Sequence, residues 1–390
     1  MQHYSGHVRN RKPKNGKLTY QVIIESPPDK ETGKRQRKYF TVHGTKKDAE
    51  KFMRDTIAAL ENQTYVAPNN YTVKSWLNEH YATYQEPYLS ESTLSGYRYQ
   101  LDNYIIPALG TTPLQNLSPM QVQQFVNDIY KKSPLSGEAL SAKTVKNVFL
   151  NLSAAMNKAF ELEMIKKNPC AHITLPKVEK TDVEIYSEEE IAKITKCAKG
   201  TDMELIIMLA LGLGLRRGEM IALRWEHVDF DNGVVHIKEN RVKGRDNKMI
   251  TKSPKSRAGT RDIPLSPSMI AILRKEKVNF FKKQLEYGVG KNKDDYVLCK
   301  SDGQPYKPFT IDNKWATFTK NNSIRHIKLH GLRHTNASLL LSKNVNSKQV
   351  QKQLGHSDFS TTMNIYAHVM QGMETEAAQK LEEALFQNVG

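Results

Sequence analysis

The chain has 390 residues and a formal net charge of +17 at pH 7. It shows no apolar run long enough to span a membrane and no signal peptide, and its three cysteines lack both paired and metal-binding spacing. These features exclude a membrane protein and a disulfide-rich scaffold, and they predict a cytoplasmic protein of two or three domains whose partner is a polyanion.

The first 66 residues carry much of the positive charge. Residues 1–47 contain twelve Lys or Arg and three acidic residues, which is +9 of the total +17. Strand-like runs at 18–24 and 37–42 are joined by a turn, and an amphipathic helix follows at 46–62. Such a basic hairpin can bind DNA, or it can simply keep a protein in solution. Six residues of this region are candidate contacts for the polyanion: Arg9, Lys17, Tyr20, Arg37, Lys38 and Tyr39.

Residues 67–180 are predicted to be helical throughout. Helical periodicity covers residues 73–84, 90–105, 118–130 and 141–162, and the apolar stripes on these helices predict a common core. A polar linker precedes this region, and a proline-containing linker follows it. Four residues at the start of the last helix are candidate phosphate contacts because of their charge and expected exposure: Ser141, Lys143, Thr144 and Lys146.

The residues that carry chemistry begin after an apolar helix at 203–211, which is broken by glycines. Arg216 follows the break and stands near the start of a helix predicted to continue to Trp225, where free N–H groups favour an anion. Glu219 lies in the first turn and can orient a neighbouring His or Arg; a plain first-turn charge pair is the alternative. Strands are predicted at 234–237, 249–250 and 261–265, with a basic hairpin tip at 251–260.

The last quarter of the chain combines histidine, arginine and tyrosine. His330 and Arg333 are spaced to share one helix face, and Gly355 is suited to end a second helix just before His356. Tyr366 follows ten residues later, and no acidic metal cluster lies among these residues. This combination predicts phosphoryl transfer with a protein nucleophile instead of a metal-activated water.

In this order the residues resemble the tyrosine recombinase, or phage integrase, family. Residues 214–220 are similar to its first-arginine motif, and residues 254–264 to its hairpin-lysine motif. The layout resembles integrases of Gram-positive temperate phages and conjugative transposons. The resemblance implies six catalytic residues supported by Glu219, with Lys252 as the alternative lysine because hairpin lengths vary: Arg216, Lys255, His330, Arg333, His356 and Tyr366.

The resemblance also implies a multidomain α+β fold. An arm-type DNA-binding domain with a small β-sheet and one helix is expected at 1–66, and an all-helical SAM-like core-binding domain at 67–180. A mainly helical catalytic domain with a small antiparallel sheet is expected at 181–390. An acidic amphipathic helix at 374–386 is expected to dock on a neighbouring subunit and to gate Tyr366; packing on its own domain is the alternative.

The implied activity is site-specific DNA recombination through a 3′-phosphotyrosyl intermediate, which integrates and excises a mobile element without metal, ATP or cofactor. The implied partners are double-stranded DNA with core-type and arm-type sites, three further copies of the chain in a homo-tetramer, and an excisionase or a host DNA-bending protein. Two alternatives remain: a type IB topoisomerase-like enzyme that relaxes DNA, and a DNA-binding regulator that has lost catalysis.

Overall fold

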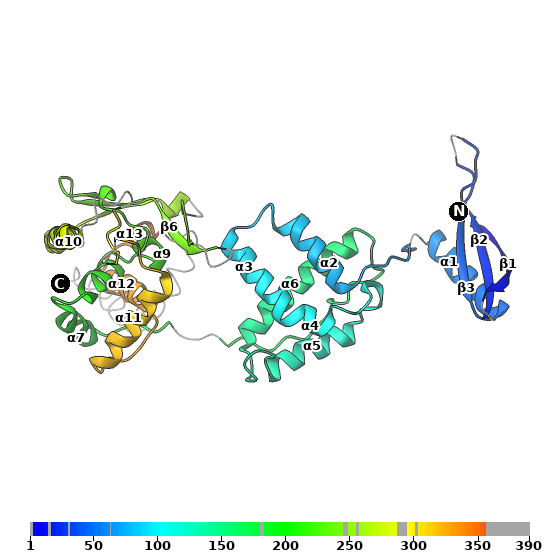
Figure 1. Cartoon of the computed structure of the whole chain (residues 1–390), viewed down its shortest axis with the longest axis horizontal. Coiled ribbons are helices and arrows are strands. Elements are labelled where there is room, and N and C mark those ends of the chain that lie inside the picture. The colour runs from blue at the N-terminus through cyan, green and yellow to red at the C-terminus, as the bar shows by residue number, and fades with distance from the viewer. Residues whose placement is uncertain are drawn as a thin grey trace, which may run out of the picture. The chain divides into compact units, whose positions relative to one another are not determined.

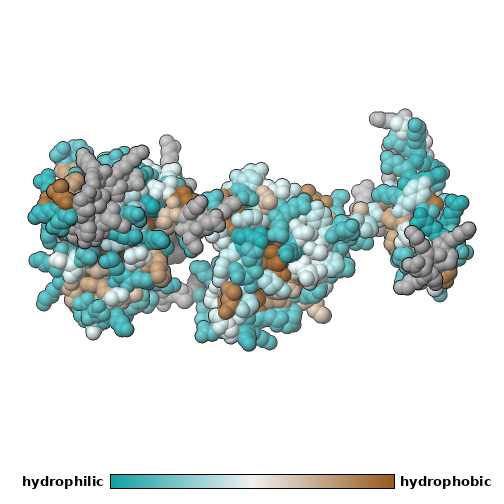
Figure 2. All heavy atoms as spheres, in the orientation of Figure 1, coloured by the Kyte–Doolittle hydropathy of each residue, from teal (hydrophilic) through white to brown (hydrophobic). Residues whose placement is uncertain are grey.

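The computed structural model describes residues 3–14, 17–29, 32–62, 64–179, 183–244, 249–254, 257–286, 295–300 and 303–355. The chain forms two compact units, Met1–Glu179 and Lys180–Gly390. The visible surface of both is mainly hydrophilic with scattered apolar spots (Figure 2). Within the described part, no helix combines the length and the apolar character that crossing a bilayer requires.

The first unit begins with a three-stranded antiparallel sheet in the order β1-β2-β3, covered on one side by a helix (Figure 1). The helix begins with a capping box in which Thr45 and Asp48 satisfy each other's backbone N–H groups. Val22, Ile24 and Ala49 are buried between sheet and helix. The sequence pattern predicts all of these elements except β1, which only the family resemblance implies: β1 (Ser5–Lys14), β2 (Lys17–Glu25), β3 (Arg37–His43) and α1 (Lys46–Glu61).

The rest of the first unit is helical, as the sequence predicts. Its core is centred on Trp76, which is 1% exposed and donates its indole N–H to the Ala155 carbonyl oxygen at 2.9 Å. Two π-helical turns, Tyr81–Gln85 and Leu101–Ile105, extend the helices before them. The helices are α2 (Val73–His80), α3 (Glu91–Gln100), α4 (Ile106–Leu109), α5 (Pro119–Lys131) and α6 (Ala142–Glu161).

The second unit is mainly helical and has a separate hydrophobic core. Trp315 is 1% exposed in this core, and its indole N–H donates to the Ile327 carbonyl oxygen at 2.7 Å. The helices are α7 (Glu188–Ala198), α8 (Met203–Ile207), α9 (Arg217–Met220), α10 (Pro267–Glu286), α11 (Pro308–Asn321), α12 (His330–Ser342) and α13 (Ser347–Leu354).

Two predictions for the second unit are wrong, one about its strands and one about a helix. The strands form a sheet in the order β4-β5-β8 and a separate ribbon of β6 and β7. Lys252 is therefore a strand residue opposite Asn240, and residues 253–260 connect two sheets instead of forming a hairpin tip. The helix predicted to reach Trp225 is also wrong, because α9 has only four residues. The strands are β4 (Val228–Asp229), β5 (Val234–Ile237), β6 (Asn240–Lys243), β7 (Met249–Lys252) and β8 (Arg261–Pro264).

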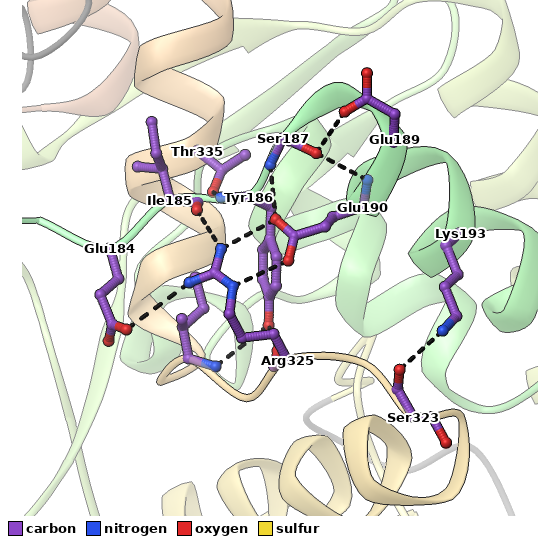
Figure 3. A network of polar contacts seen from close by, with 11 residues as sticks. Glu184, Ile185, Tyr186, Ser187, Glu189, Glu190, Lys193, Ser323, Arg325 and Thr335 are labelled. Carbon is purple, nitrogen blue, oxygen red and sulfur yellow. Dashed lines mark hydrogen bonds and ion pairs between the residues drawn. The ribbon is translucent and has the colours of Figure 1, made fainter.

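A surface network around Arg325 holds the start of the second unit against α12 (Figure 3). The Arg325 guanidinium donates to both carboxylate oxygens of Glu190 at 3.0 Å and lies over the Tyr186 ring. The backbone N–H of Tyr186 donates to the Thr335 hydroxyl at 3.1 Å. Glu184 is a second carboxylate near Arg325, at 3.8 Å. We call these residues the Arg325 network.

Candidate active site

Seven residues are predicted to form the catalytic site, and four of them fall in the described part of the chain. Arg216, Glu219 and Arg333 come together, and His330 lies one turn from Arg333 on α12. The three others lie outside the described residues: Lys255, His356 and Tyr366.

Arg216 immediately precedes α9, as the glycine break in the sequence indicates. Its guanidinium donates from Nη1 to Glu219 at 2.7 Å and from Nη2 to the Gly355 carbonyl oxygen at 2.6 Å. Gly214, two residues earlier, packs closely against α12 and α13: it has a φ of +66°, and a Cβ there would lie 2.5 Å from the Leu354 side chain and 2.8 Å from the Asn336 amide oxygen. About a third of the Arg216 side chain, 35%, stays exposed, so it is accessible to a ligand.

Glu219 is the buried carboxylate of this site. Its side chain is 2% exposed and accepts hydrogen bonds from both Arg216 and Arg261. Burial alone raises the pKa of Glu219, but the hydrogen bonds and charge of Arg261 and the charge of Arg216 outweigh burial and lower that pKa. The prediction that Glu219 orients an arginine is consistent with this geometry.

Arg333 is almost completely buried on α12, with 1% exposure. Its guanidinium donates to the carbonyl oxygens of Gly214 at 2.5 Å and Leu354 at 2.6 Å. Burial, followed by the like charge of Arg216, lowers the pKa of Arg333 to about 9, which leaves the group charged at pH 7. Among the described residues its Nε–H has no acceptor.

The carboxyl end of α13 binds three arginines. The consecutive carbonyl oxygens of residues 353, 354 and 355 accept from Arg261, Arg333 and Arg216, respectively. These are carbonyls that a helix end leaves without intrahelical partners, and the negative end of the helix dipole favours cations there. Gly355 ends the helix with a φ of +66°, as predicted, and a Cβ at this position would lie 2.6 Å from the Ala258 carbonyl oxygen.

The charges in this cluster do not balance. Among the residues that the structure describes, Arg216 and Arg261 pair with the one carboxylate of this cluster, Glu219, and the third guanidinium group, that of Arg333, lies near enough to feel its charge. Backbone carbonyl oxygens supply hydrogen bonds but no net negative charge. The cluster therefore favours an anion in contact with its exposed edge, which Arg216 forms.

His330 extends the cluster along α12. Although the residue as a whole is exposed, its ring packs edge-on against that of His334, with centroids 4.6 Å apart. Partial burial of the ring, followed by His334 and the charges of Arg333 and Arg216, lowers the pKa of His330 to about 4. The imidazole is thus neutral at pH 7 and can accept a proton.

The two candidate lysines lie on and beyond β7. Lys252 is half-buried and opposite Asn240, and a Cβ on Gly218 of α9 would lie 2.0 Å from the Asn240 side-chain oxygen. The end of β7 is therefore close to α9, which begins next to Arg216. Lys255 is three residues further along and outside the described part, so the assignment of the lysine stays a prediction.

Arg261 belongs to the site although it is not among the predicted residues. It begins β8, its side chain is 3% exposed, and it makes a bidentate ion pair with Glu219 at 2.9 and 3.1 Å. The alternation of side chains along the predicted strand at 261–265 could have indicated it. Arg261 shares the inward face with Ile263 and Leu265, and a buried arginine needs a buried partner.

The six predicted contacts of the N-terminal sheet do not share one face. Strand register places Arg9, Arg37 and Tyr39 on the face away from α1, together with Arg11, which the sequence analysis left out. Tyr20 instead packs on the core beneath α1, and Lys38 lies on that side with its ammonium 4.7 Å from the Tyr65 ring centroid. The side chain of Lys17 lies outside the described part.

The four predicted contacts on α6 lie at its N-terminal end. Ser141 caps the helix by accepting from the Thr144 N–H at 3.2 Å, and the two hydroxyl groups also bond to each other. Lys143 and Lys146 are exposed one turn apart. A helix N-terminus flanked by two lysines suits a phosphate, but here Ser141 already caps the helix and bonds to the Thr144 hydroxyl.

No group of three or more His, Cys, Asp or Glu side chains with metal-binding geometry occurs among the residues that the structure describes. The site is instead built from guanidinium groups, a neutral imidazole and one buried carboxylate.

Two family models match the chain. Residues 185–372 match the phage integrase family, and this range contains every predicted catalytic residue from Arg216 to Tyr366. Residues 72–130 match the SAM-like N-terminal domain of phage integrases.

Curated relatives and solved structures agree with these models. The chain is 28% identical to a XerC-like tyrosine recombinase of Caldanaerobacter subterraneus subsp. tengcongensis, over 95% of this chain and 97% of the relative. It is 23% identical to the ICEBs1 integrase of Bacillus subtilis, over 74% of this chain and 77% of the relative.

Solved integrases share the fold. The Tn1549 transposon integrase, solved in complex with a circular intermediate DNA, matches with a TM-score of 0.66 and 20% identity over 79% of this chain and 99% of that chain. The lambda integrase dimer bound to a core site matches with a TM-score of 0.57 and 18% identity over 91% of this chain and 93% of that chain. The mixed helix-and-sheet fold expected from the sequence is therefore confirmed. This chain belongs to the phage integrase family of tyrosine recombinases, enzymes that cleave and rejoin DNA in site-specific recombination.

Proposed function

We propose that this recombinase integrates and excises a mobile element through a covalent 3′-phosphotyrosine on Tyr366. The observation that supports this most directly is the meeting of Arg216 and Arg333, which are far apart in sequence, in one cluster with excess positive charge. A phosphodiester gains negative charge on its nonbridging oxygens in the transition state, and two guanidinium groups can neutralise those oxygens without a metal ion.

In the proposed cleavage step, the phosphorus of one DNA phosphodiester becomes bonded to Tyr366. The Tyr366 oxygen attacks the phosphorus, a P–O bond to tyrosine forms, and the bond to the 5′ oxygen breaks. His330 accepts the tyrosine proton, which fits its neutral state at pH 7. Lys255, or Lys252 in its place, donates a proton to the leaving 5′ oxygen, and His356 donates a hydrogen bond to the phosphate. Attack by the 5′-hydroxyl of another strand reverses the step and reseals the backbone.

We assign a separate role to each part of the chain. Residues 1–66 bind arm-type sites through the open face of the sheet, where Arg9, Arg11 and Tyr39 are exposed. Residues 67–180 hold core-type DNA at the start of α6, and residues 181–390 carry the catalytic site. A protein that binds two kinds of site can bridge separated DNA segments with a high effective concentration.

The acting assembly is a homo-tetramer on two synapsed duplexes in the bacterial cytoplasm. An amphipathic segment at 374–386, outside the described residues, docks on the neighbouring subunit and gates Tyr366. An excisionase or a host DNA-bending protein biases the direction of the reaction.

Covalent trapping tests this proposal. DNA fragments from both ends of the element that carries the gene are incubated with the full chain, and protein–DNA adducts are resolved on a denaturing gel. We expect adducts at one position per strand with the wild type and none with Tyr366→Phe, whose DNA affinity is unchanged. Adducts that persist in Tyr366→Phe contradict the choice of nucleophile.

A second assay separates the alternatives. A substrate pair with two labelled duplexes gives recombinant products only if strands are exchanged. Relaxed circles without recombinants indicate a topoisomerase-like enzyme, and DNA binding without any adduct indicates a silent regulator.

A further inference from the structure

Arg261 contacts α9, the end of α13 and the residues that lead into its own strand. Its guanidinium pairs with both oxygens of Glu219, donates from Nη1 to the Gly259 carbonyl oxygen at 3.1 Å, and donates from Nε to the Gln353 carbonyl oxygen at 2.5 Å. The side chain is 3% exposed. A buried arginine in this place has no route to substrate of its own, so any influence on the reaction passes through these partners.

The first partner connects Arg261 with Arg216. Glu219 Oε2 accepts from the Arg216 backbone N–H and from Arg261 Nη2, both at 2.9 Å, and Oε1 accepts from both guanidinium groups. The carboxylate is thus held between the two arginines. Without Arg261, half of its hydrogen bonds are lost, and the direction in which it holds Arg216 is no longer determined.

The second partner connects Arg261 with the segment before His356. Gln353 is in the last turn of α13, and a Cβ on Gly355 would lie 3.1 Å from Arg261 Nη1. The guanidinium therefore packs directly beneath the residue that precedes His356. Because the adjacent carbonyls of Leu354 and Gly355 bind Arg333 and Arg216, a shift of this turn also moves both phosphate-binding arginines.

The third partner connects Arg261 with the lysine segment. Gly259 receives the Arg261 bond through its carbonyl oxygen, and a Cβ on Gly259 would lie 2.3 Å from the Pro254 side chain. Pro254 directly precedes Lys255 in the sequence. The described ends of the segment that carries Lys255 are thus in contact with each other and with Arg261.

We propose that Arg261 is a positioning residue that sets Arg216, the end of α13 before His356 and the described residues that flank Lys255 in their relative places for phosphoryl transfer. Only arginine has the planar fork needed here: Nε, Nη1 and Nη2 donate in different directions to acceptors on three segments, whereas a lysine ammonium donates from a single point. This inference rests on the proposed function of Arg216, Lys255 and His356.

The test compares Arg261→Lys with wild type in single-turnover covalent cleavage of a duplex that carries the mapped cleavage site, at saturating enzyme. We expect the rate constant for adduct formation to fall about 30- to 100-fold, since small misplacements of reacting groups have effects of this size. We expect DNA affinity to stay within about threefold, because the charge is kept and Arg261 is buried. The final adduct yield, which counts folded molecules, stays near the wild-type level.

Arg325→Lys is the matched control, because Arg325 also makes a bidentate pair with a glutamate in the same unit but lies at the surface. We expect its rate constant to stay within about twofold. The positioning role is overturned if Arg261→Lys cleaves at the wild-type rate constant. It is also overturned if the adduct yield and the melting temperature of this variant fall while its rate constant stays at the wild-type value. Absence of adducts with the wild type contradicts the proposed function instead.

A double-mutant cycle examines the link through Glu219 and stays informative if Arg261→Lys folds poorly. Glu219→Gln, Arg261→Gln and the double variant are compared at a temperature at which each is folded. If Arg261 acts through Glu219, the double variant is no slower than the slower single variant. Multiplied effects contradict a shared route.

Discussion

Two arginine–carboxylate clusters in the second unit differ in burial and in charge balance. Around Glu219, three arginines share one carboxylate, and Arg261 and Arg333 are nearly inaccessible. In the Arg325 network, one arginine at 45% side-chain exposure faces two carboxylates, Glu184 and Glu190 (Figure 3). Among the described residues, the first cluster has more cations than anions, and the second has more anions than cations.

This difference indicates that the cluster around Glu219 is suited to bind an anion, whereas the Arg325 network attaches one surface segment to another. Burial makes charge imbalance costly, so the cluster around Glu219 gains most from a phosphate that restores the balance. Solvent screens the charges of the Arg325 network, which holds a backbone segment and contributes little energy. Similar side chains thus have different consequences because their surroundings differ.

The largest expected effect comes from replacing a buried arginine of the site. Arg333→Lys keeps a positive charge but loses the fork that reaches the Gly214 and Leu354 carbonyl oxygens. We expect covalent cleavage to slow at least about 100- to 1000-fold, comparable to the loss of an oxyanion donor. Single-turnover adduct formation measures this. If Arg333→Lys cleaves as fast as Arg325→Lys, the buried and the exposed cluster do not differ in their importance for cleavage.

Removing the shared carboxylate comes next. Glu219→Gln leaves three guanidinium groups with no buried counter-charge, so we expect a loss of about 3 to 5 kcal/mol in unfolding free energy of the second unit. Urea denaturation measures this, and added sulfate should restore more stability to the variant than to wild type. Glu190→Gln serves as the surface control, with a loss below about 1 kcal/mol.

His80 offers a third case: a buried ionisable group that carries no charge at pH 7. The residue is 6% exposed, and burial, followed by the charge of Lys158, lowers its pKa to about 4. An unfolded histidine titrates near 6.5, so the unfolded state binds more protons between these pH values. The stabilisation is complete above pH 6.5 and is lost as the pH falls toward 4.

We expect the stability around α2 to fall by at most about 2 kcal/mol between pH 7.5 and pH 5 because of His80. Hydrogen exchange of α2 amides, corrected for intrinsic rates, measures the change, and His80→Gln should show little of it. An equal pH dependence in wild type and His80→Gln assigns the effect to other groups.

The smallest effect is expected in the Arg325 network. Arg325→Gln should lower stability by no more than about 1 kcal/mol, and the difference should shrink at 1 M salt, because exposed charges are screened there. Thermal unfolding at low and high salt measures this. If Arg325→Gln loses much more stability than this at both salt concentrations, the Arg325 network stabilises the unit as strongly as the cluster around Glu219.

Sequence patterns were sufficient where the signal is local. The helices of the first unit follow from periodicity, and the end of α13 follows from Gly355, because only a residue tolerant of positive φ fits there. The proximity of Arg216, Glu219 and Arg333 was also predictable, but only through the family resemblance. Spacing along the chain says nothing of contacts between residues so far apart.

Strand pairing and buried contacts were not predictable from the sequence. The segment at 251–260 has the composition of a hairpin tip, yet β7 pairs with β6 and β8 pairs with β5, so it joins two sheets. In the N-terminal sheet, register decides that Arg9 and Tyr39 share a face that Tyr20 and Lys38 do not.

The sequence by itself indicated the kind of chemistry, because arginine, histidine and tyrosine without an acidic metal cluster among them predict phosphoryl transfer with a protein nucleophile, and its net positive charge predicted a polyanion as partner. Only the tertiary structure decided how the charges are held. Hydrogen bonds between Arg261, Glu219 and the end of α13 depend on three distant segments meeting in a buried place, and no local pattern encodes that meeting.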